Sequence, residues 1–471
     1  MFLNRNFLKK TLTLNILTNS KFLISIITQI ILTKYLESTI FGKFAIILFI
    51  VDIIFSLTVV DQQAIIKYQY KKSIIFTSEI LCNYFSNILF FISLVIFLIV
   101  FHIKNFSLEF LIVAFIIIIS RWIKYRLIIS EAHLEKKLQY EKIYLYYFIN
   151  SLISNIACLV LLYFDYGIIA LATREIIDSI SHYALLKHKQ NKLKNKFNFN
   201  IAKIIIKFSL QNAFINILNI FQFRAIYLFL GIIFSSASLV GVFERASFFI
   251  FAVSNFFSQV LDRIFVPLIS KKNSHKIKNY FMNIFFIYKI FIFFPIGVLT
   301  FFFGEKFIVM LFGANWSSTG EIVSILSFWL IFNNLYQILE RWIFVKKTKV
   351  FSIISSLISF FSILIAALYL YYHDNRQWTL FAWALNVSSL INLLIAIFLS
   401  VKIKQTYFSL KPIIFSIIYF LFSFLFFYYL SNLNYLLLIS IYFFIYFFLI
   451  YLIFKNSLFY LIDDKTKKQT L

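Results

Sequence analysis

The sequence predicts an all-α polytopic membrane protein with about fourteen transmembrane helices, and three observations support this fold class. Hydrophobic residues make up 62% of the chain and charged residues only 14%, so a soluble domain of this composition could not cover itself with polar surface. The chain contains only 8 glycines and 3 prolines, which favours long uninterrupted helices over a many-turned β-barrel. Apolar runs such as Phe110–Ser120 also lack the period-two alternation of membrane strands.

Polar interruptions divide the chain into successive apolar spans. Most spans are roughly 20–25 residues long, the length that a helix needs to cross ~30 Å of hydrocarbon. The predicted spans lie near residues 11–33, 40–62, 74–101, 107–131, 143–164, 166–186, 201–229, 238–268, 280–303, 321–345, 350–371, 379–401, 412–431 and 435–454. The first span is too polar to be the apolar segment of a cleavable signal peptide, so we expect it to be a transmembrane helix.

Lysines and arginines concentrate in every second connection between these spans and at both ends of the chain. The basic connections contain Lys67, Lys71, Lys136, Lys137, Lys189, Lys192, Lys271, Lys272, Lys346, Lys347, Lys402 and Lys404. The positive-inside rule places such connections in the cytoplasm, so we expect both termini to be cytoplasmic. The net charge of +26 then follows from topology, and we expect no nucleic-acid partner.

The connections also suggest how the spans are grouped. The basic connection after the sixth span lies where a linker between two six-helix halves would be. We therefore expect an N-terminal six-helix lobe over residues 1–190, a cytoplasmic linker over 191–200 and a second six-helix lobe over 201–405. Residues 406–471 would form two further transmembrane helices and a cytoplasmic tail. The longest outer loop is expected at Gly304–Gly320.

A weak internal repeat supports the two halves. Ser38–Ala45, ahead of the second span, and Ala237–Ala246, ahead of the eighth, each place a small residue before a Gly-x-Phe sequence. Six helices separate the two copies, so both would cross the membrane in the same direction. This arrangement predicts a parallel repeat related by an axis along the membrane normal.

Polar side chains recur at helical spacing on the first and seventh spans. The stripe on the first span consists of Thr11, Asn15, Thr18, Ser25 and Gln29, and the stripe on the seventh consists of Ser209, Asn212, Asn216 and Asn219. Amides that face lipid are costly, so these stripes should face other helices or water. Hydrogen bonds between helices would explain them. Because they recur in both halves, we favour an aqueous cavity whose polar wall includes Asn15, Gln29, Asn212, Asn216 and Asn219.

Ionisable residues inside the spans are candidates for function, because a charge at mid-bilayer costs at least ~2.5–3.5 kcal/mol. Those well inside the spans are Lys21, Asp52, Arg121, Lys124, Arg174, Glu175, Asp178, Glu244 and Arg245. Arg224 lies nearer the end of its span, where snorkelling of the side chain to the membrane surface is the default explanation. Arg121 and Lys124 share a helix face without an acidic neighbour on that helix, and Lys21 is similarly isolated. Arg174 and Asp178 have the spacing of an ion pair within one helix.

Unpaired cations near the membrane centre need a counter-charge, and an anionic substrate could supply it. We therefore predict a set of substrate-binding cavity cations, which comprises Arg121, Lys124, Arg174, Lys21 and Arg245. A second set of residues is a candidate for ion coupling, and it comprises Asp52, Asp178 and Glu244.

Sequence motifs of enzymes are absent. The chain has no Walker A lysine loop, no GxSxG and no HExxH, so we expect a non-enzyme without catalytic residues. Its six histidines form no metal-like cluster, and Cys82 and Cys158 lie inside apolar spans without a pairing pattern. We expect no metal and no cofactor.

Three short segments carry a family resemblance. Thr33–Phe44 is similar to the pattern R-x-L-G-x-x-x-x-G-x-[FY], although Lys34 stands where Arg is usual and Glu37 where glycine is common. Val240–Ala246 is similar to G-x-[YF]-x-x-A, and Leu311–Trp316 is similar to F-G-x-x-[WY]. Through these motifs, its length and its loop pattern, the whole chain resembles the polysaccharide transporter family of the MOP flippase superfamily, which contains the flippases of O-antigen and capsule repeat units.

The resemblance implies two six-helix bundles in a V around a central cavity, plus two C-terminal helices, in the bacterial inner membrane. It also implies alternating access and a substrate that is an undecaprenyl-diphosphate-linked oligosaccharide, as in lipopolysaccharide synthesis. The partners would be this lipid-linked oligosaccharide, the lipid bilayer and glycan polymerase machinery. The cavity cations would hold the diphosphate, and Gln29, Asn212 and Asn216 would bind sugar hydroxyls.

Other functions remain as alternatives. A multidrug exporter of the same superfamily would favour acidic cavity residues, whereas the surplus inside these spans is basic. A lipid II flippase would also have fourteen helices. A membrane glycan polymerase or ligase would resemble its relatives in having a large outer loop, and the sequence predicts none.

Overall fold

The chain folds into long helices over the part that the structure describes. The computed structural model describes residues 5–57, 60, 72–104, 107–136, 140–187, 197–270, 275–346, 350–373 and 377–402. The elements are α1 (Arg5–Tyr35), α2 (Ser38–Ser56), α4 (Lys72–Lys104), α5 (Leu108–Lys136), α6 (Tyr140–Tyr163), α7 (Gly167–Lys187), α8 (Phe199–Ile233), α9 (Ala237–Ser270), α10 (His275–Phe312), the 3-10 helix η1 (Ala314–Trp316), α11 (Ser317–Lys346), α12 (Val350–Tyr372) and α13 (Leu380–Lys402).

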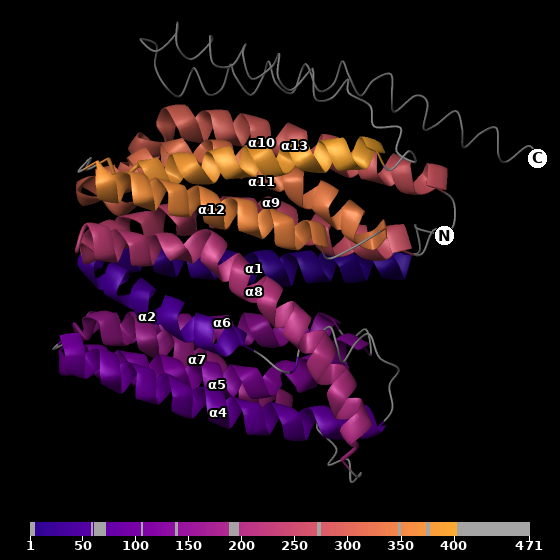
Figure 1. The fold of residues 1–471 in the computed structure, drawn as a ribbon, viewed down its shortest axis with the longest axis horizontal. Helices are drawn as coiled ribbons and strands as arrows, with labels where there is room; N and C mark the ends of the chain where they lie inside the picture. The colour runs from indigo at the N-terminus through magenta and orange to yellow at the C-terminus, as the bar shows by residue number, and fades with distance from the viewer. Residues whose placement is uncertain are drawn as a thin grey trace, which may run out of the picture.

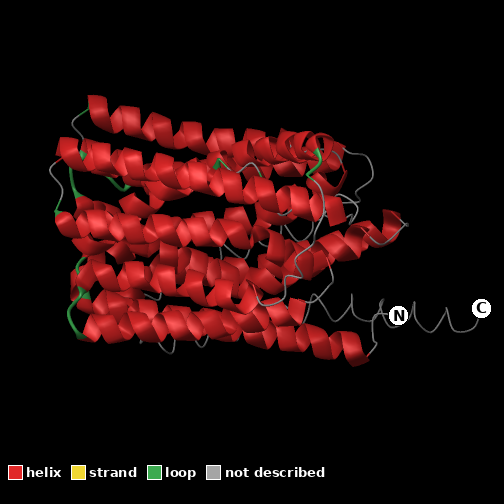
Figure 2. Cartoon of the chain, turned by 90° about the horizontal axis from the view of Figure 1, so that it is seen from below, coloured by secondary structure: helices red, strands yellow, loops and turns green. Residues whose placement is uncertain are grey.

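The helices lie side by side along one direction of the molecule, and α8 crosses obliquely over them (Figure 1). The view from below shows the same elongated helical body (Figure 2). Ten of the described helices are long and apolar enough to cross a membrane by length and composition. The chain is therefore a helical, multi-pass membrane protein, as the sequence predicts. The expected spans 412–431 and 435–454 lie outside the described residues.

The helices α5 and α7 are not among those ten, because both carry several charges within their apolar stretch. A helix with internal charges is stable inside a membrane only if its neighbours supply partners for them. These two helices pack against each other, and α5 also packs on α2. Their charged faces are therefore turned toward protein.

Short connections with unusual backbone geometry reverse the chain. Asp165 turns the chain between α6 and α7, and Ser235 turns it between α8 and α9, each with positive φ. Asn198 caps the start of α8, where its side chain accepts a hydrogen bond from Ile201 N at 3.1 Å. Connections this short place successive helices antiparallel.

The prediction of a long outer loop at Gly304–Gly320 is wrong. The helix α10 continues to Phe312, and α11 already begins at Ser317. The glycines at the two ends of that range allow close packing of α10 on α11, since a Cβ on Gly304 would lie 2.6 Å from Ser324 Oγ. The turn itself is made at Gly313, whose φ of 103° favours glycine.

Helices pack mostly within each half of the chain. In the first half α1 packs on α6, and α7 packs on both α5 and α6; in the second half α11 packs on α9, α10 and α13. The contact between the halves is made chiefly by α2, which packs on α8 and α9. The main hydrophobic core crosses this junction, since Phe41 and Phe49 of α2 belong to the same cluster as Phe243 of α9.

Candidate functional site

A network of charges links three helices of the first half to one helix of the second. Arg121 and Lys124 project from α5 three residues apart, and Glu175 and Asp178 project from α7 at the same spacing. Arg121 Nη1 lies 2.6 Å from Glu175 Oε2, and Lys124 Nζ lies 3.3 Å from that same oxygen. Lys124 Nζ also lies 3.0 Å from Asp178 Oδ2.

The network continues through Asp52 of α2. Arg121 Nε donates to Asp52 Oδ1 at 2.6 Å, and Arg224 Nη1 of α8 donates to Asp52 Oδ2. One carboxylate therefore binds a cation from each half of the chain. The network contains three carboxylates and three cations, so it is balanced in formal charge. Its side chains are between 17% and 37% exposed, so none of them is fully buried.

The expectation that Arg121 and Lys124 lack a counter-charge is wrong. Their carboxylate partners lie on α2 and α7, and a helix face read along one span does not show groups on neighbouring helices. The ion pair expected between Arg174 and Asp178 is also wrong, because Asp178 pairs with Lys124 instead. Arg174 Nη2 instead donates to Ser25 Oγ of α1 at 2.9 Å.

Arg224, which the sequence assigns to snorkelling, lies at the junction between the halves. Its guanidinium faces Asp52 instead of the membrane surface. Lys21 is likewise not isolated, because its Nζ lies 4.6 Å from the centroid of the Tyr147 ring. Glu175 is an internal charge to which the sequence assigns no role. No signal in a single sequence links Asp52 to Arg224, which is 172 residues away.

Arg245 is buried in a second set of contacts. It is 4% exposed, and its Nη2 donates to Glu244 Oε1 at 2.8 Å while Nη1 donates to Gln29 Oε1. Its guanidinium also lies 4.0 Å from the centroid of the Phe41 ring. The structure thus places Arg245 in a polar link between α1, α2 and α9, where its charge is neutralised, and not among unpaired cavity cations.

A polar cavity of about 670 Å³ lies between α2, α8 and α9. Its charged lining residues among those described are Asp52, Arg224 and Glu244. Asn216 and Asn219 also line it, whereas Asn212 and Gln29 are buried. The side chain of Asn15 lies outside the described residues. The cavity therefore brings together one end of the charge network and part of the predicted polar wall.

At one end of the junction between the halves, Gly42 of α2 and Gly241 of α9 allow the two helix backbones to touch. The two copies of the internal repeat touch there, because a Cβ on Gly42 would lie 1.7 Å from Ala237 O and a Cβ on Gly241 would lie 1.8 Å from Ser38 O. Ser38 Oγ lies 2.6 Å from Ser238 Oγ. The two contacts are reciprocal, as expected for a small-xxx-small helix crossing. This is the end that the loop charges predict to be extracytoplasmic.

The aromatic residue of the third motif reinforces the same end. Trp316 Nε1 donates to the carbonyl oxygen of Thr33 at 2.9 Å, and the indole packs edge-on against Phe41 at 5.8 Å. Thr33 and Phe41 belong to the first half of the chain, and Trp316 belongs to the second. The three segments that carry the family resemblance therefore meet at one junction.

Comparison with known proteins decides the family. A family model described as "Polysaccharide biosynthesis protein" matches residues 31–321. This chain belongs to the polysaccharide biosynthesis protein family. No curated protein sequence matches it at a significant level.

Solved structures share the fold of this polysaccharide biosynthesis protein. The lipid II flippase MurJ in an inward closed conformation matches with a TM-score of 0.75 and 17% identity, over 94% of this chain and 99% of that chain. An inward-facing multidrug resistance MATE transporter of the MOP superfamily matches with a TM-score of 0.56 and 12% identity, over 84% and 96% of the chains. The MATE transporter VcmN of Vibrio cholerae in its bent form matches with a TM-score of 0.52 and 13% identity, over 82% and 94%.

These structures show that the polysaccharide biosynthesis protein shares the fold of the lipid II flippase MurJ and of MATE transporters. Among the described residues, no group of three or more His, Cys, Asp or Glu side chains could hold a metal ion. The described site offers ion pairs and hydrogen-bonding side chains beside a cavity between the two halves.

Proposed function

We propose that this protein is a flippase that moves an undecaprenyl-diphosphate-linked oligosaccharide from the cytoplasmic to the outer leaflet of the bacterial inner membrane. The observation that carries the proposal is the ion pair between Asp52 and Arg224, which joins the two halves of the chain on the wall of a polar cavity. Membership of a polysaccharide biosynthesis family supports a lipid-linked glycan as the substrate.

The diphosphate binds by replacing a protein carboxylate. Arg121 and Arg224 both pair with Asp52, and guanidinium groups form bidentate hydrogen bonds with phosphate as readily as with carboxylate. Exchanging one anion for another keeps Arg121 and Arg224 paired but releases the Asp52 carboxylate. Asp52 must therefore take up a proton as the diphosphate binds, because a buried charge without a partner is costly. A balanced network can thus bind an anionic substrate when one of its carboxylates is neutralised by a proton.

The sugar and the lipid occupy different surroundings. Asn216 and Asn219 present amide groups to the cavity, where they can donate and accept hydrogen bonds with sugar hydroxyls. Phe223 and Phe251 line the same cavity, and their rings pack edge-on at 5.1 Å, which gives a rigid aromatic wall. The polyprenyl chain stays on the apolar side of the helices.

Anion exchange also supplies a reason for movement. When the diphosphate takes Arg224 from Asp52, the ion pair between the halves is lost, and the balance between two arrangements of the halves changes. The lobes proposed to move are residues 1–190 and 201–405, with both termini in the cytoplasm. Asp52 and Glu244, which line the cavity, and Asp178 are the carboxylates proposed to couple transport to an ion gradient.

The test is transport in proteoliposomes with the purified chain and a fluorescent undecaprenyl-diphosphate-linked oligosaccharide. We expect Arg224→Gln to reduce the translocation rate by at least about tenfold, since one charge-assisted contact with phosphate is worth ~1.5–3 kcal/mol. The matched control is Arg126→Gln, because Arg126 stacks on Trp122 at 3.9 Å and donates to Asn87, away from the network.

Parallel vesicles carry lipid II or a cationic dye. Translocation of lipid II or of the dye, with no translocation of the oligosaccharide lipid, would contradict the proposed substrate. Equal rates for Arg224→Gln and Arg126→Gln would contradict the proposed role of the network.

A further inference from the structure

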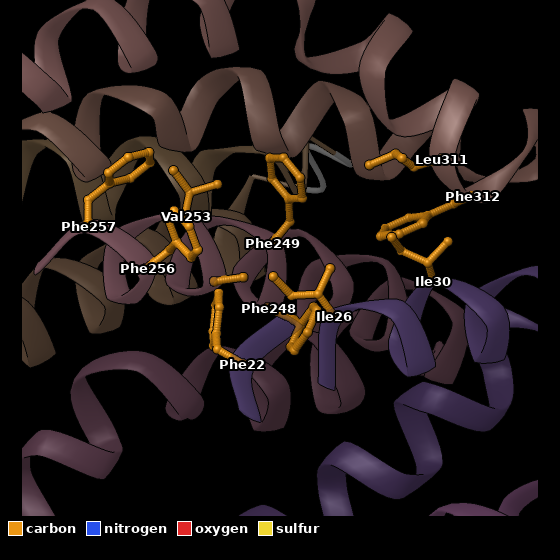
Figure 3. A pocket seen from close by; sticks show the side chains of 11 residues that line it. Phe22, Ile26, Ile30, Phe248, Phe249, Val253, Phe256, Phe257, Leu311 and Phe312 are labelled. Atoms are coloured by element: carbon orange, nitrogen blue, oxygen red, sulfur yellow. The ribbon is translucent and has the colours of Figure 1, made fainter. Parts of the chain in front are cut away.

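A second pocket lies beside the polar cavity and is lined only by apolar side chains. It has a volume of about 180 Å³ and lies between α1, α9 and α10. Figure 3 shows Phe22, Ile26 and Ile30 of α1 facing aromatic rings and Val253 of α9, with Leu311 of α10 on the remaining side. The pocket therefore joins one helix of the first half to two helices of the second.

Phe248 belongs to both the pocket and the cavity. Its ring lines the apolar pocket and also the polar cavity that contains Asp52 and Arg224. The guanidinium of Arg245 lies 5.1 Å from the centroid of this ring, which helps to fix its position. A single aromatic side chain thus stands between a polar cavity and an apolar pocket.

The helix α9 creates this division through its periodicity. Glu244, Ser247 and Phe251 face the cavity, whereas Phe249 and Val253 face the pocket. Phe248 lies at the boundary between the two faces. A ligand that fills both spaces must be polar at one end and hydrocarbon at the other, and its two parts must be joined near Phe248.

We infer that the apolar pocket binds the isoprene units next to the diphosphate of the transported lipid while its headgroup occupies the polar cavity. This inference rests on the proposed function. A cavity of about 150 Å³ is known to hold benzene, so the pocket holds a stretch of similar size, about one or two isoprene units. The remainder of the chain lies in the bilayer.

Proximity selects this occupant over bulk phospholipid. Lipid tails are as apolar as the pocket, so transfer of an acyl chain from the bilayer gains little from the hydrophobic effect. A chain attached to a headgroup in the cavity is instead held beside Phe248 at high effective concentration. Methyl branches can then make close dispersion contacts with the rings and branched side chains of the pocket.

The experiment uses a polyprenyl diphosphate with a diazirine in its first isoprene units, photolysed with the full-length protein in phospholipid nanodiscs. Labelled peptides are mapped by mass spectrometry. We expect labelling around Val253 and Leu311, and we expect an excess of unlabelled undecaprenyl diphosphate to remove it. The matched variants are Ile26→Trp, which fills the pocket, and Ile27→Trp at the neighbouring position, which is 57% exposed.

Ile26→Trp should reduce the labelling by about tenfold, equivalent to ~1.4 kcal/mol of binding, because the added indole occupies the space of the bound chain. The extent of labelling in Ile27→Trp should equal that in the parent protein. Binding of inorganic pyrophosphate is measured on all three proteins, and it should be unchanged if Ile26→Trp folds. If that variant does not fold, Val253→Leu, a smaller filling of the same pocket, takes its place.

Three results would overturn the inference. Labelling elsewhere on the protein that undecaprenyl diphosphate removes would contradict the pocket but leave the flippase proposal standing. Equal labelling of the pocket by a diazirine phospholipid, without competition, would show that a bilayer acyl chain fills it. Absence of any competed labelling, together with no pyrophosphate binding, would instead contradict the proposed function itself.

Discussion

Arg121 and Lys124 on α5 face Glu175 and Asp178 on α7 with matching spacing, so each cation meets a carboxylate. This match allows two strongly charged helices to lie inside a membrane protein. A buried pair gains little net stability over an apolar pair, but the loss of one partner is costly. Single neutralising substitutions therefore reveal the network more clearly than any count of ion pairs.

The sequence indicated which residues carry internal charge but not how they pair. Arg121 lies inside a predicted span, but its partners are 54 and 69 residues away along the chain. Periodicity within one helix reports which side chains share a face, and it carries no information about the helix opposite. For the same reason, the spacing within one helix predicts Arg174 as the partner of Asp178, whereas the structure shows Lys124 of the neighbouring helix.

Glu175→Gln should lower the free energy of unfolding by ~1–3 kcal/mol, because Arg121 and Lys124 would then compete for fewer carboxylates. The value lies below that for a fully buried pair, since Glu175 is 24% exposed. Denaturant unfolding in detergent measures it. Glu109→Gln, at the exposed start of helix α5, is the control and should lose less than ~1 kcal/mol. Equal losses in both variants would contradict the network.

Arg245→Lys should destabilise the protein without weakening the binding of pyrophosphate. Lysine keeps the charge but cannot bind Glu244 and Gln29 at once while stacking on Phe41, so we expect a loss of ~1–3 kcal/mol. Calorimetric titration with pyrophosphate accompanies the unfolding measurement. A fall in pyrophosphate affinity with unchanged stability would return Arg245 to the group of substrate-binding cations.

At the scale of elements, the crossing of α2 and α9 determines how closely the halves approach. The sequence repeat around Gly42 and Gly241 predicted that the halves are related, but it did not predict that its two copies touch each other. That contact depends on tertiary packing. Long apolar runs predict the described helices well. The expected outer loop is wrong because α10 continues to Phe312, beyond the predicted span that ends near residue 303.

Gly42→Ala should weaken the closed crossing, whereas Gly231→Ala should not. A methyl group at Gly42 would overlap Ala237 O, but the nearest atom to a Cβ at Gly231 is Ile46 Cδ1 at 3.7 Å. The readout is oxidative crosslinking of Ser38→Cys with Ser238→Cys, positions whose side chains touch in the parent. We expect the crosslinking rate to fall by about tenfold in Gly42→Ala, equivalent to ~1.4 kcal/mol. The native Cys82 and Cys158 are buried.

An unchanged crosslinking rate in Gly42→Ala would show that the halves are not held together at this crossing. A fall of the same size in Gly231→Ala would show that the effect is not specific to the junction.

At the scale of the whole molecule, the two halves share a polar cavity. Asp52 lines this cavity and, within the described network, is the carboxylate that pairs with a cation from each half. The glycine contacts between α2 and α9 close one end of this junction, and the charge network lies further along it. Closure through small residues and attraction through one ion pair are both weak enough to reverse. Such a junction suits a protein that alternates between two arrangements.

The most direct test of this account is the affinity of the purified protein for pyrophosphate in Asp52→Asn and Arg224→Gln, measured by calorimetric titration beside Arg126→Gln. If Asp52 competes with the diphosphate for Arg121 and Arg224, then Asp52→Asn should bind pyrophosphate about tenfold more tightly and Arg224→Gln about tenfold more weakly. Changes in the same direction for both variants, or no difference from Arg126→Gln, would contradict anion exchange at the junction of the halves.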